Sequence, residues 1–242
     1  MKNAIIVGGS NGIGLAITLS LTDYDQLFIL DRSEPGTTLP PNCRYIPFDL
    51  LEKDYSILDR LPSISTLIIT AGYGKLALFK DMHEEEIEPL FLVNTVGIIR
   101  IIRHFYDRIE SSSSDFYCAV MVSISGMISS PFFSVYSATK AALHRFIESV
   151  NVELEKNASI NRILEVSPGA IKGTCFNGRE NDLLQTQPLA MDIVKRMRKK
   201  ETLFIPDYET IFKEVIRRYN DNPHDFGLQS YEYKIKSGRI NQ

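Results

Sequence analysis

The chain has 242 residues, 44% of them hydrophobic, and a formal net charge of −3. This length and apolar content allow one large α/β domain with an ample core. The near-neutral charge and the lack of a long basic run argue against a nucleic-acid partner, and no apolar run approaches the roughly 20 residues needed to span a bilayer.

Cysteine and histidine usage excludes two further classes. The three cysteines are widely spaced and the four histidines are scattered, so the sequence predicts neither a disulfide framework nor a metal site. The first apolar stretch ends at Gly8, too early for a signal peptide. Together these features predict a reduced, cytoplasmic protein without a membrane partner.

Short apolar runs alternate with segments of helical periodicity, a pattern typical of parallel strands joined by crossover helices. We expect strands at 4–8, 26–30, 44–48, 66–70, 116–123, 160–166 and 202–205. We expect helices at 12–21, 51–61, 85–110, 133–156, 189–200 and 208–219, and the last twenty or so residues carry no clear pattern. The pattern predicts one doubly wound, Rossmann-type domain over residues 1–242, with about seven strands and helices on both faces.

A glycine-rich segment joins the first expected strand to the first helix and reads Gly8-Gly9-Ser10-Asn11-Gly12-Ile13-Gly14. Glycine permits the backbone angles of a tight turn, and the N–H groups at the start of a helix can bind a pyrophosphate. The spacing is Gly-x3-Gly-x-Gly, not the Gly-x-Gly-x-x-Gly of many dinucleotide folds. A glycine turn without a ligand is the plainer alternative.

Two charged residues at the end of the second strand bear on the choice of cofactor. Asp31 follows Gly14 by some seventeen residues, where a carboxylate can accept hydrogen bonds from the adenosine ribose. The same carboxylate would repel a 2′-phosphate. Because the Arg32 guanidinium could bind that phosphate instead, we predict NAD and keep NADP as the alternative.

Tyr136 and Lys140 are the most informative pair in the chain. They are four residues apart on one expected helix face, and Tyr136 is the only one of eleven tyrosines with a lysine at that spacing. An ammonium beside a phenol lowers the phenol pKa and makes the tyrosine usable as a general acid or base. This pair, with the glycine turn and Ser123, indicates nicotinamide-dependent redox chemistry.

These residues resemble the short-chain dehydrogenase/reductase family. Over residues 4–172 the matching positions, in the order of that family, are Gly8-x3-Gly12-Ile13-Gly14, Asp31, Asp49, Ala71-Gly72, Asn94-x2-Gly97, Ser123, Tyr136-x3-Lys140 and Pro168-Gly169. The ordered set is far more specific than any single motif. The resemblance implies an NAD(P)-dependent oxidoreductase that interconverts a secondary alcohol and a ketone by hydride transfer.

The resemblance also implies a role for each catalytic residue. Tyr136 would be the general acid in reduction and the base in oxidation, while Lys140 would lower its pKa and hold the nicotinamide ribose. Ser123 would hydrogen-bond the substrate oxygen, and Asn94 would anchor a water on the proton path. Ser125 competes with Ser123 for its role, and Asn94 could instead bond to backbone.

The implied cofactor contacts extend over much of the chain. They comprise Gly8, Ser10, Asn11, Gly12, Ile13, Gly14, Asp31, Arg32, Asp49, Leu50, Ala71, Gly72, Tyr136, Lys140 and Ile171. Asp49 and Leu50 would touch adenine, and Ile171 would meet the nicotinamide carboxamide through its backbone. Asp49 could instead start a turn.

The sequence departs from the family pattern mainly in its last third. Thr174 comes one place later than the usual threonine after Pro-Gly, and the usual glycine-rich final strand is absent. We expect residues 174–190 to form a mobile lid within a variable substrate-lid and C-terminal region, 174–242. Met127, Phe132, Phe133 and Phe176 indicate an apolar pocket wall or ordinary core packing.

Three functional hypotheses follow. The leading one is the oxidoreductase with a small alcohol or ketone substrate, and the second is a non-catalytic nicotinamide-nucleotide sensor that uses the fold to bind partners. The third, a nucleotide-sugar epimerase or dehydratase, lacks its usual Gly-x2-Gly-x2-Gly turn and larger lobe. Apolar residues beyond one stripe of helices 85–110 and 133–156 further predict a homodimer or homotetramer through them.

Overall fold

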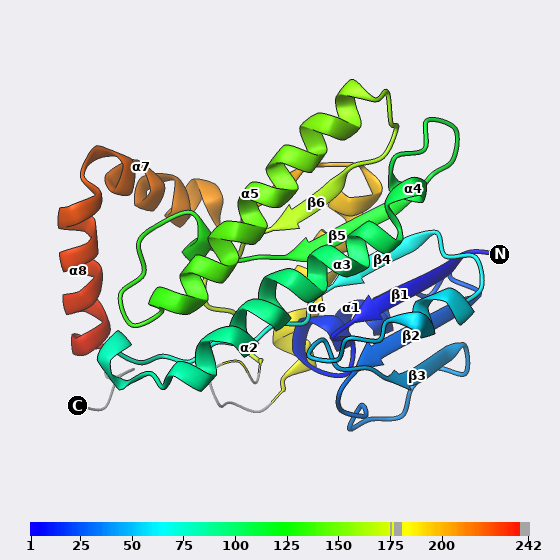
Figure 1. Ribbon diagram of the computed structural model, residues 1–242, viewed down its shortest axis with the longest axis horizontal. Helices are drawn as coiled ribbons and strands as arrows, with labels where there is room; N and C mark the ends of the chain where they lie inside the picture. Colours follow the sequence, from blue (N-terminus) through cyan, green and yellow to red (C-terminus); the bar gives the residue numbers. More distant parts are fainter. Residues whose placement is uncertain (175, 177–180, 238–242) are drawn as a thin grey trace.

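The protein is built around one parallel seven-stranded sheet (Figure 1), and the computed structural model describes residues 1–174, 176 and 181–237. The strands are β1 (Asn3–Val7), β2 (Gln26–Asp31), β3 (Cys43–Pro47), β4 (Thr66–Ile69), β5 (Tyr117–Met121), β6 (Ile163–Val166) and β7 (Leu203–Phe204). Across the sheet they follow the order β3-β2-β1-β4-β5-β6-β7, with every neighbouring pair parallel. The chain winds outward from β1 in both directions, which confirms the predicted doubly wound fold.

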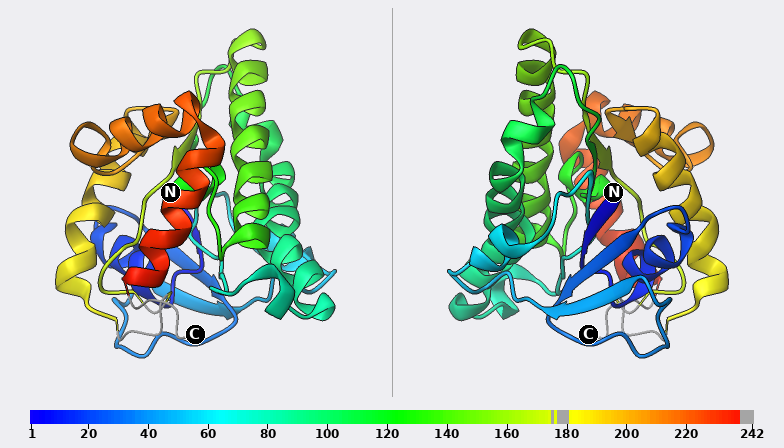
Figure 2. Two further views of the ribbon diagram at one scale, coloured as in Figure 1. Left: turned by 90° about the vertical axis from the view of Figure 1, so that its left-hand side faces the viewer. Right: turned by 90° about the vertical axis from the view of Figure 1, so that its right-hand side faces the viewer.

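Helices cover both faces of this sheet, as the side views show (Figure 2). The α-helices are α1 (Gly12–Ser20), α2 (Ile87–Phe91), α3 (Gly97–His104), α4 (Tyr106–Ile109), α5 (Ser134–Lys156), α6 (Leu183–Arg198), α7 (Lys213–Asp221) and α8 (Pro223–Lys236). The 3₁₀ turns are η1 (Ser56–Arg60), η2 (Phe79–Asp81), η3 (Glu84–Glu86) and η5 (Ile124–Gly126), and the π-helical turns are η4 (Leu92–Val96) and η7 (Tyr208–Phe212). Within the described residues, no helix has the length and apolar character to cross a membrane.

Side-chain alternation along the central strands divides the core into two layers. Val7 of β1 belongs to a buried cluster with residues of α3 and α5, and Ile6 belongs to the cluster with α1 and α6. Both residues are at most 1% exposed, and burying a side chain of this size stabilises the fold by about 1.5–3 kcal/mol. Because β1 is covered on both faces, its sequence is a continuous apolar run and not an alternating one.

The helix predicted at 51–61 is wrong, since the structure forms only η1 there. The Asp49 carboxylate accepts a hydrogen bond from Leu51 N–H at 2.9 Å, and the Asp54 carboxylate accepts one from Ser56 N–H at 2.8 Å. Aspartate side chains that bond to nearby amides offer the backbone an alternative to helix. Local turn formation therefore outweighs the apolar periodicity of this segment.

The single helix predicted at 85–110 is a series of shorter pieces. They are η3, α2, η4, α3 and α4, and the backbone leaves helical geometry at Phe105, with φ −96° and ψ 5°. The Phe105 ring enters the core at 4% exposure. The π-helical turn η4 contains Asn94, and such turns are frequent at functional positions.

The C-terminal third is more helical than the sequence pattern indicated. α6 begins at Leu183 because the Asp182 carboxylate caps it, accepting hydrogen bonds from Leu184 N–H and Gln185 N–H. Residues 183–190 are therefore helix and not part of the expected mobile lid, while 175 and 177–180 lie outside the described residues. The unassigned tail contains α8, which Asn222 caps.

A buried polar cluster joins α5 to β6. His144 Nδ1 lies 2.9 Å from a Glu165 carboxylate oxygen, and Ser167 Oγ donates to the same carboxylate at 2.7 Å. The side chains of His144 and Glu165 are only 14% and 3% exposed. The hydrogen bond to Glu165 raises the pKa of His144, against the opposing effect of burial.

This pair should make stability depend on pH. A histidine whose folded pKa is raised adds stability that is complete below its ordinary value of about 6.5 and is lost as pH rises through the folded pKa. We expect the stability difference between wild type and His144→Gln to be about 1 kcal/mol larger at pH 6 than at pH 9, measured by urea unfolding. His104→Gln, which removes the more exposed His104 beside Asp59 at 3.8 Å, is the control. A difference that does not change with pH would contradict this prediction.

Candidate active site

The site lies at the carboxyl ends of β1 and β4, where the strand order reverses direction. These two strands are neighbours in the centre of the sheet, with Val7 paired to Ile69. In open α/β sheets, ligands bind in the crevice outside the strands at this point. The glycine turn follows β1, and Ala71-Gly72 follows β4, so the two predicted cofactor segments meet there.

The glycine turn packs too closely on its neighbours for larger residues. Gly8 has φ +83°, and a Cβ there would lie 2.4 Å from Ala71 N; a Cβ on Gly14 would lie 2.0 Å from Gly8 O. Gly12, at φ +48°, begins α1. These close approaches explain the Gly-x3-Gly-x-Gly spacing and bring the start of α1 to the carboxyl ends of β1 and β4.

The Ser10 hydroxyl of the turn remains for a ligand to satisfy. Ser10 is 1% exposed, and its hydroxyl has no hydrogen-bond partner within the described part of the chain. Asn11 occupies the N-cap position of α1, yet its side chain makes no cap hydrogen bond. A buried hydroxyl without a partner is unusual, and helix-terminal amides favour anions, so the turn fits a pyrophosphate group.

The residues predicted to contact the adenosine part of the cofactor differ in their positions. Asp31 lies beside the turn, and its carboxylate accepts hydrogen bonds from Ser10 N–H at 3.1 Å and Ser33 N–H at 3.3 Å. Arg32 is exposed. Asp49 starts its own turn, the plainer alternative from the sequence, and Leu50 is buried at 6% exposure.

Tyr136 and Ser123 are brought together by the fold. Tyr136 lies in the first turn of α5 and Ser123 follows β5, and the Ser123 side chain lowers the pKa of the phenol. The backbone of Ser125 bonds to its neighbours, because its N–H donates to Ser123 Oγ at 3.1 Å and its carbonyl accepts from the Ser137 hydroxyl. Ser123 is the serine that acts on the pKa of the phenol.

Lys140 is a buried cation one helical turn after Tyr136. It is 2% exposed, its Nζ donates to Met121 O at 3.0 Å, and this Nζ lies 5.9 Å from the centre of the Tyr136 ring. That bond to Met121 is the one hydrogen bond of the ammonium among the described residues. Since an ammonium has three donors, two remain for a ligand such as the hydroxyls of a ribose.

The pKa values in the site differ from the sequence expectation. Burial raises the pKa of Tyr136 to about 12, and the hydrogen bond with Ser123 opposes that rise only in part. Burial also lowers the pKa of Lys140 to about 8. In this structure the net shift of the Tyr136 pKa is upward, because removing both groups from water favours their neutral forms.

Asn94 braces the loop that follows β4. It is fully buried; its amide oxygen accepts from Tyr73 N–H at 3.0 Å, and its Nδ2 donates to Tyr73 O at 2.8 Å and to Thr139 Oγ1 at 3.2 Å. A Cβ on Gly72 would lie 3.1 Å from Asn94 Oδ1 and 3.3 Å from Lys140 Nζ. Asn94 therefore bonds to backbone, which is the alternative that the sequence left open. The backbone in question belongs to the loop after β4 and not to its own helix.

Aromatic rings cover Tyr136. The rings of Phe133 and Phe176 lie 5.3 Å and 5.4 Å from the Tyr136 ring, centre to centre. A Cβ on Gly74 would lie 2.9 Å from both Tyr136 and Phe176. These contacts agree with the expected apolar wall around the phenol.

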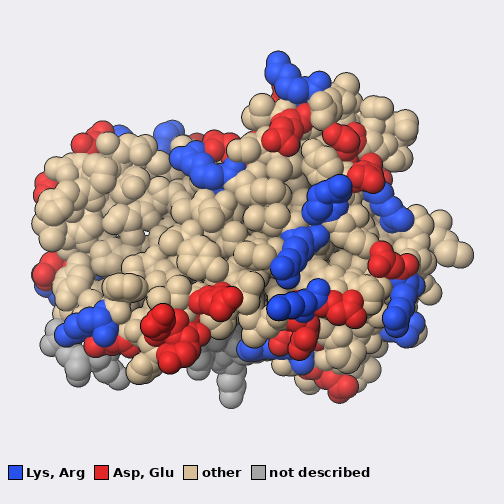
Figure 3. Space-filling model, viewed as in Figure 1, with Lys and Arg blue, Asp and Glu red and all other residues tan. Residues whose placement is uncertain are grey.

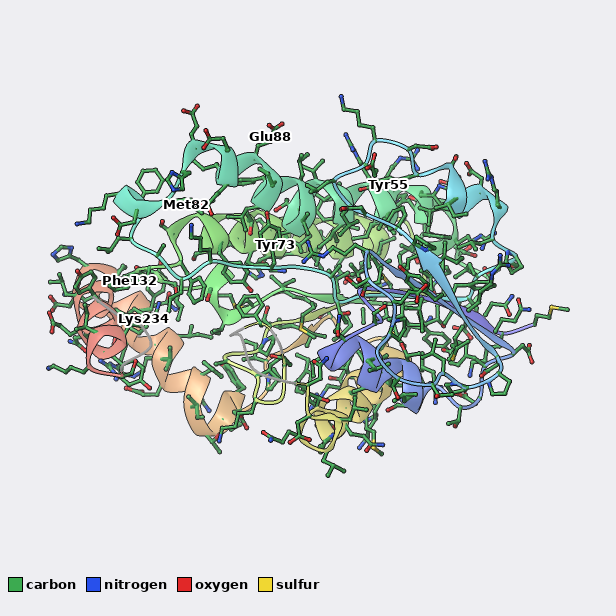
Figure 4. The ribbon with its side chains drawn as sticks, turned by 90° about the horizontal axis from the view of Figure 1, so that it is seen from below. Tyr55, Tyr73, Met82, Glu88, Phe132 and Lys234 are labelled. Carbon is green, nitrogen blue, oxygen red and sulfur yellow. The ribbon has the colours of Figure 1, made fainter. Side chains whose placement is uncertain are left out.

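The C-terminal helix α8 supports this wall. Tyr231 stacks on Phe132 at 4.7 Å, and Lys234 Nζ donates to Ser130 Oγ at 2.8 Å and to Pro131 O at 2.6 Å. Figure 4 shows Phe132 and Lys234 side by side at this edge. Phe132 has φ +67°, a conformation that is costly for a phenylalanine and that the contacts with α8 hold in place.

The segment after β6 reaches the glycine turn. Ile171 is partly buried against the cluster of α1 and α6. Thr174 donates to Ile171 O at 3.2 Å, and a Cβ on Gly12 would lie 3.4 Å from Thr174 Cγ2. Asn181 Oδ1 accepts a hydrogen bond from Gly12 N–H at 3.1 Å. Sequence reasoning missed Asn181 and Tyr73, because neither has a local motif and both meet the site only through long-range contacts.

Comparison with known proteins agrees with this geometry. The sequence model of the short chain dehydrogenase family matches residues 2–183, and the chain belongs to that family. An uncharacterized oxidoreductase of Staphylococcus epidermidis is 24% identical over 210 residues, which are 80% of this chain and 89% of the relative.

Two solved structures illustrate the shared fold. A short chain dehydrogenase from Burkholderia cenocepacia in complex with NADP has a TM-score of 0.76 at 17% identity, covering 95% of this chain and 96% of that one. An alcohol dehydrogenase from Thermococcus sibiricus, complexed with 5-hydroxy-NADP, has a TM-score of 0.69 at 23% identity, covering 85% and 95%. At these identities the likeness concerns the fold alone.

Proposed function

We propose that this member of the short-chain dehydrogenase family interconverts a secondary alcohol and a ketone with NAD or NADP. The observation that carries the proposal is the buried Tyr136 phenol with the buried Lys140 ammonium 5.9 Å from its ring, beside Ser123 and the glycine turn. When bound, the nicotinamide cofactor supplies or accepts the hydride. The groups of the turn, Lys140 and the backbone at Ala71-Gly72 would hold it.

The protein residues would supply the proton and stabilise the charge. With a pKa of about 12, Tyr136 is protonated at neutral pH and can donate to a carbonyl oxygen as negative charge develops there. The Ser123 hydroxyl, which acts on the same phenol, can donate to the same oxygen. Lys140, with a pKa of about 8, is mostly charged at pH 7 and favours the phenolate that remains. In oxidation the same groups would act in reverse.

The apolar wall suggests the class of substrate. Phe133 and Phe176 flank the phenol, and the Ser130–Phe133 loop is fixed by α8. An alcohol or ketone that carries an apolar group beside the reacting carbon would bury that group against these rings.

One observation favours the alternative, a non-catalytic nucleotide sensor. Tyr136 is only 7% exposed, and rings of the chain itself cover it. A sensor could fill the substrate position in this way. However, Phe176 is 41% exposed, so little packing opposes its movement away from the phenol, and we retain the enzyme as the better hypothesis.

We also propose that the cofactor preference lies with NAD, because the Asp31 carboxylate lies beside the turn. The NADP-bound structures above share the fold at under 25% identity, so they do not decide the preference here.

A cytoplasmic location stays a prediction.

A homodimer or homotetramer through the helices between residues 85 and 156 is a further part of the proposal. Val152 on α5 is 58% exposed, and Leu92 and Val96 of η4 are half-buried. The face seen in Figure 3 has a broad area without charged side chains on its left-hand half. Uncharged, partly apolar helix faces are typical of subunit interfaces.

The Tyr136→Phe variant tests the reaction. Removing the hydroxyl should lower turnover of a ketone that the wild type reduces by about 10²–10⁴-fold, followed by NAD(P)H absorbance, while NAD(P)H affinity stays within about threefold. Tyr106→Phe, on α4, is the control and should keep full activity. Turnover by Tyr136→Phe at the wild-type rate would exclude the proposed role.

Replacing Asp31 tests the cofactor preference. We expect wild type to bind NADH more tightly than NADPH, and Asp31→Ser to bind NADPH about tenfold more tightly than wild type, or about 1.4 kcal/mol. Titration calorimetry measures both. Asp54→Ser, which removes an exposed turn aspartate, should change neither affinity. Wild-type preference for NADPH would refute the proposed preference.

Analytical ultracentrifugation tests the assembly. We expect a dimer or tetramer at micromolar concentration, and Val152→Glu should shift it toward monomer because a charge in an apolar interface is costly. A wild-type protein that sediments only as a monomer would refute the proposed assembly.

A further inference from the structure

The Asn181 side chain is hydrogen-bonded to an amide of the glycine turn that could otherwise bind an anion. Its Oδ1 accepts a hydrogen bond from Gly12 N–H at 3.1 Å, and its Nδ2 donates to Asn11 Oδ1 at 2.9 Å. Gly12 is the first residue of α1, so its amide has no acceptor within the helix. A carboxamide oxygen therefore lies where a phosphate oxygen would bind.

Rigid neighbours hold Asn181 at this position. Asp182 caps α6 and donates its N–H to Gly173 O at 3.1 Å. Gly173 has φ +72°, and a Cβ there would lie 2.7 Å from Asp182 O, so this close crossing requires glycine. Because α6 and α1 share one buried cluster, the start of α6 lies next to the start of α1. The contact between Asn181 and Gly12 follows from this packing.

The turn also carries groups that its own side chains leave unsatisfied. The Ser10 hydroxyl is buried and has no partner among the described residues. The Asn11 side chain does not cap α1, and its oxygen bonds to Asn181 instead. A ligand oxygen at the start of α1 would meet both a helix-terminal amide and these polar groups.

We infer that Asn181 competes with the cofactor pyrophosphate for Gly12 N–H, so that the cofactor-free protein holds its own phosphate turn closed. This inference rests on the proposed function. Cofactor binds only the fraction of molecules in which the turn is free, and the apparent Kd rises by the inverse of that fraction. One neutral hydrogen bond corresponds to a change of about 2–10-fold.

Two substitutions at Asn181 with opposite expected effects on cofactor affinity test the inference. Asn181→Ala should bind NADH about 2–10-fold more tightly than wild type, and should bind ADP-ribose more tightly too, since ADP-ribose has the pyrophosphate without the redox ring. Asn181→Asp should bind both more weakly, because a carboxylate accepts more strongly at a helix start and repels phosphate. Calorimetry and NADH fluorescence give the affinities without turnover.

Stability and a matched control complete the experiment. Without ligand, Asn181→Ala should unfold at a lower temperature than wild type, because Gly12 N–H loses its acceptor. Asn157→Ala removes an exposed asparagine that donates to Glu110 at 2.7 Å and should leave both affinities unchanged.

The outcomes separate this inference from the proposed function. If wild type binds NADH and Asn181→Ala binds it equally or less tightly, the inference is overturned and the proposed function stands. If neither protein binds NADH, NADPH or ADP-ribose, the proposed function fails and the inference fails with it.

Discussion

The burial of the Lys140 ammonium is the constraint on which the site depends. A charged group at 2% exposure needs a polar partner, and the carbonyl of Met121 at the end of β5 provides it. To reach that carbonyl, α5 must lie close to the loop after β5: a Cβ on Gly126 would lie 2.7 Å from the Lys140 backbone, and one on Gly72 would lie 3.3 Å from Nζ. The same approach brings Tyr136 to Ser123, so one buried cation fixes the positions of the reactive groups.

The loss of water that makes burial of the Lys140 charge unfavourable also keeps the Tyr136 phenol protonated. Both groups have pKa values displaced toward their neutral forms, Tyr136 to about 12 and Lys140 to about 8. Residues whose pKa values are shifted this far by burial are candidates for a functional site. Asn94 contributes rigidity to the same site, since its three hydrogen bonds tie the loop after β4 to α5.

The C-terminal third adds elements that bear on the site from two sides. α6 packs on α1 and carries Asn181 to the phosphate turn, whereas α8 bonds to the loop before α5 and supports the aromatic wall. The family match ends at residue 183, so β7, α7 and α8 lie beyond it. Differences between relatives in this region would therefore alter the wall and leave the cation and the turn unchanged.

The sequence by itself determined the fold class and the approximate positions of the seven strands, because apolar periodicity and glycine positions are local properties of the chain. It was wrong where local and long-range effects compete. Residues 51–61 look helical, but aspartate side chains form turns there, and α6 replaces much of the expected lid.

Only the tertiary structure decided which serine meets Tyr136, that Asn94 bonds to Tyr73, and that Asn181 covers Gly12. The tertiary structure also decided the pKa values, because they depend on how much water the packed chain removes from each group and not on the spacing of the residues. Spacing places two side chains on one helix face, but the surrounding layers set their charge.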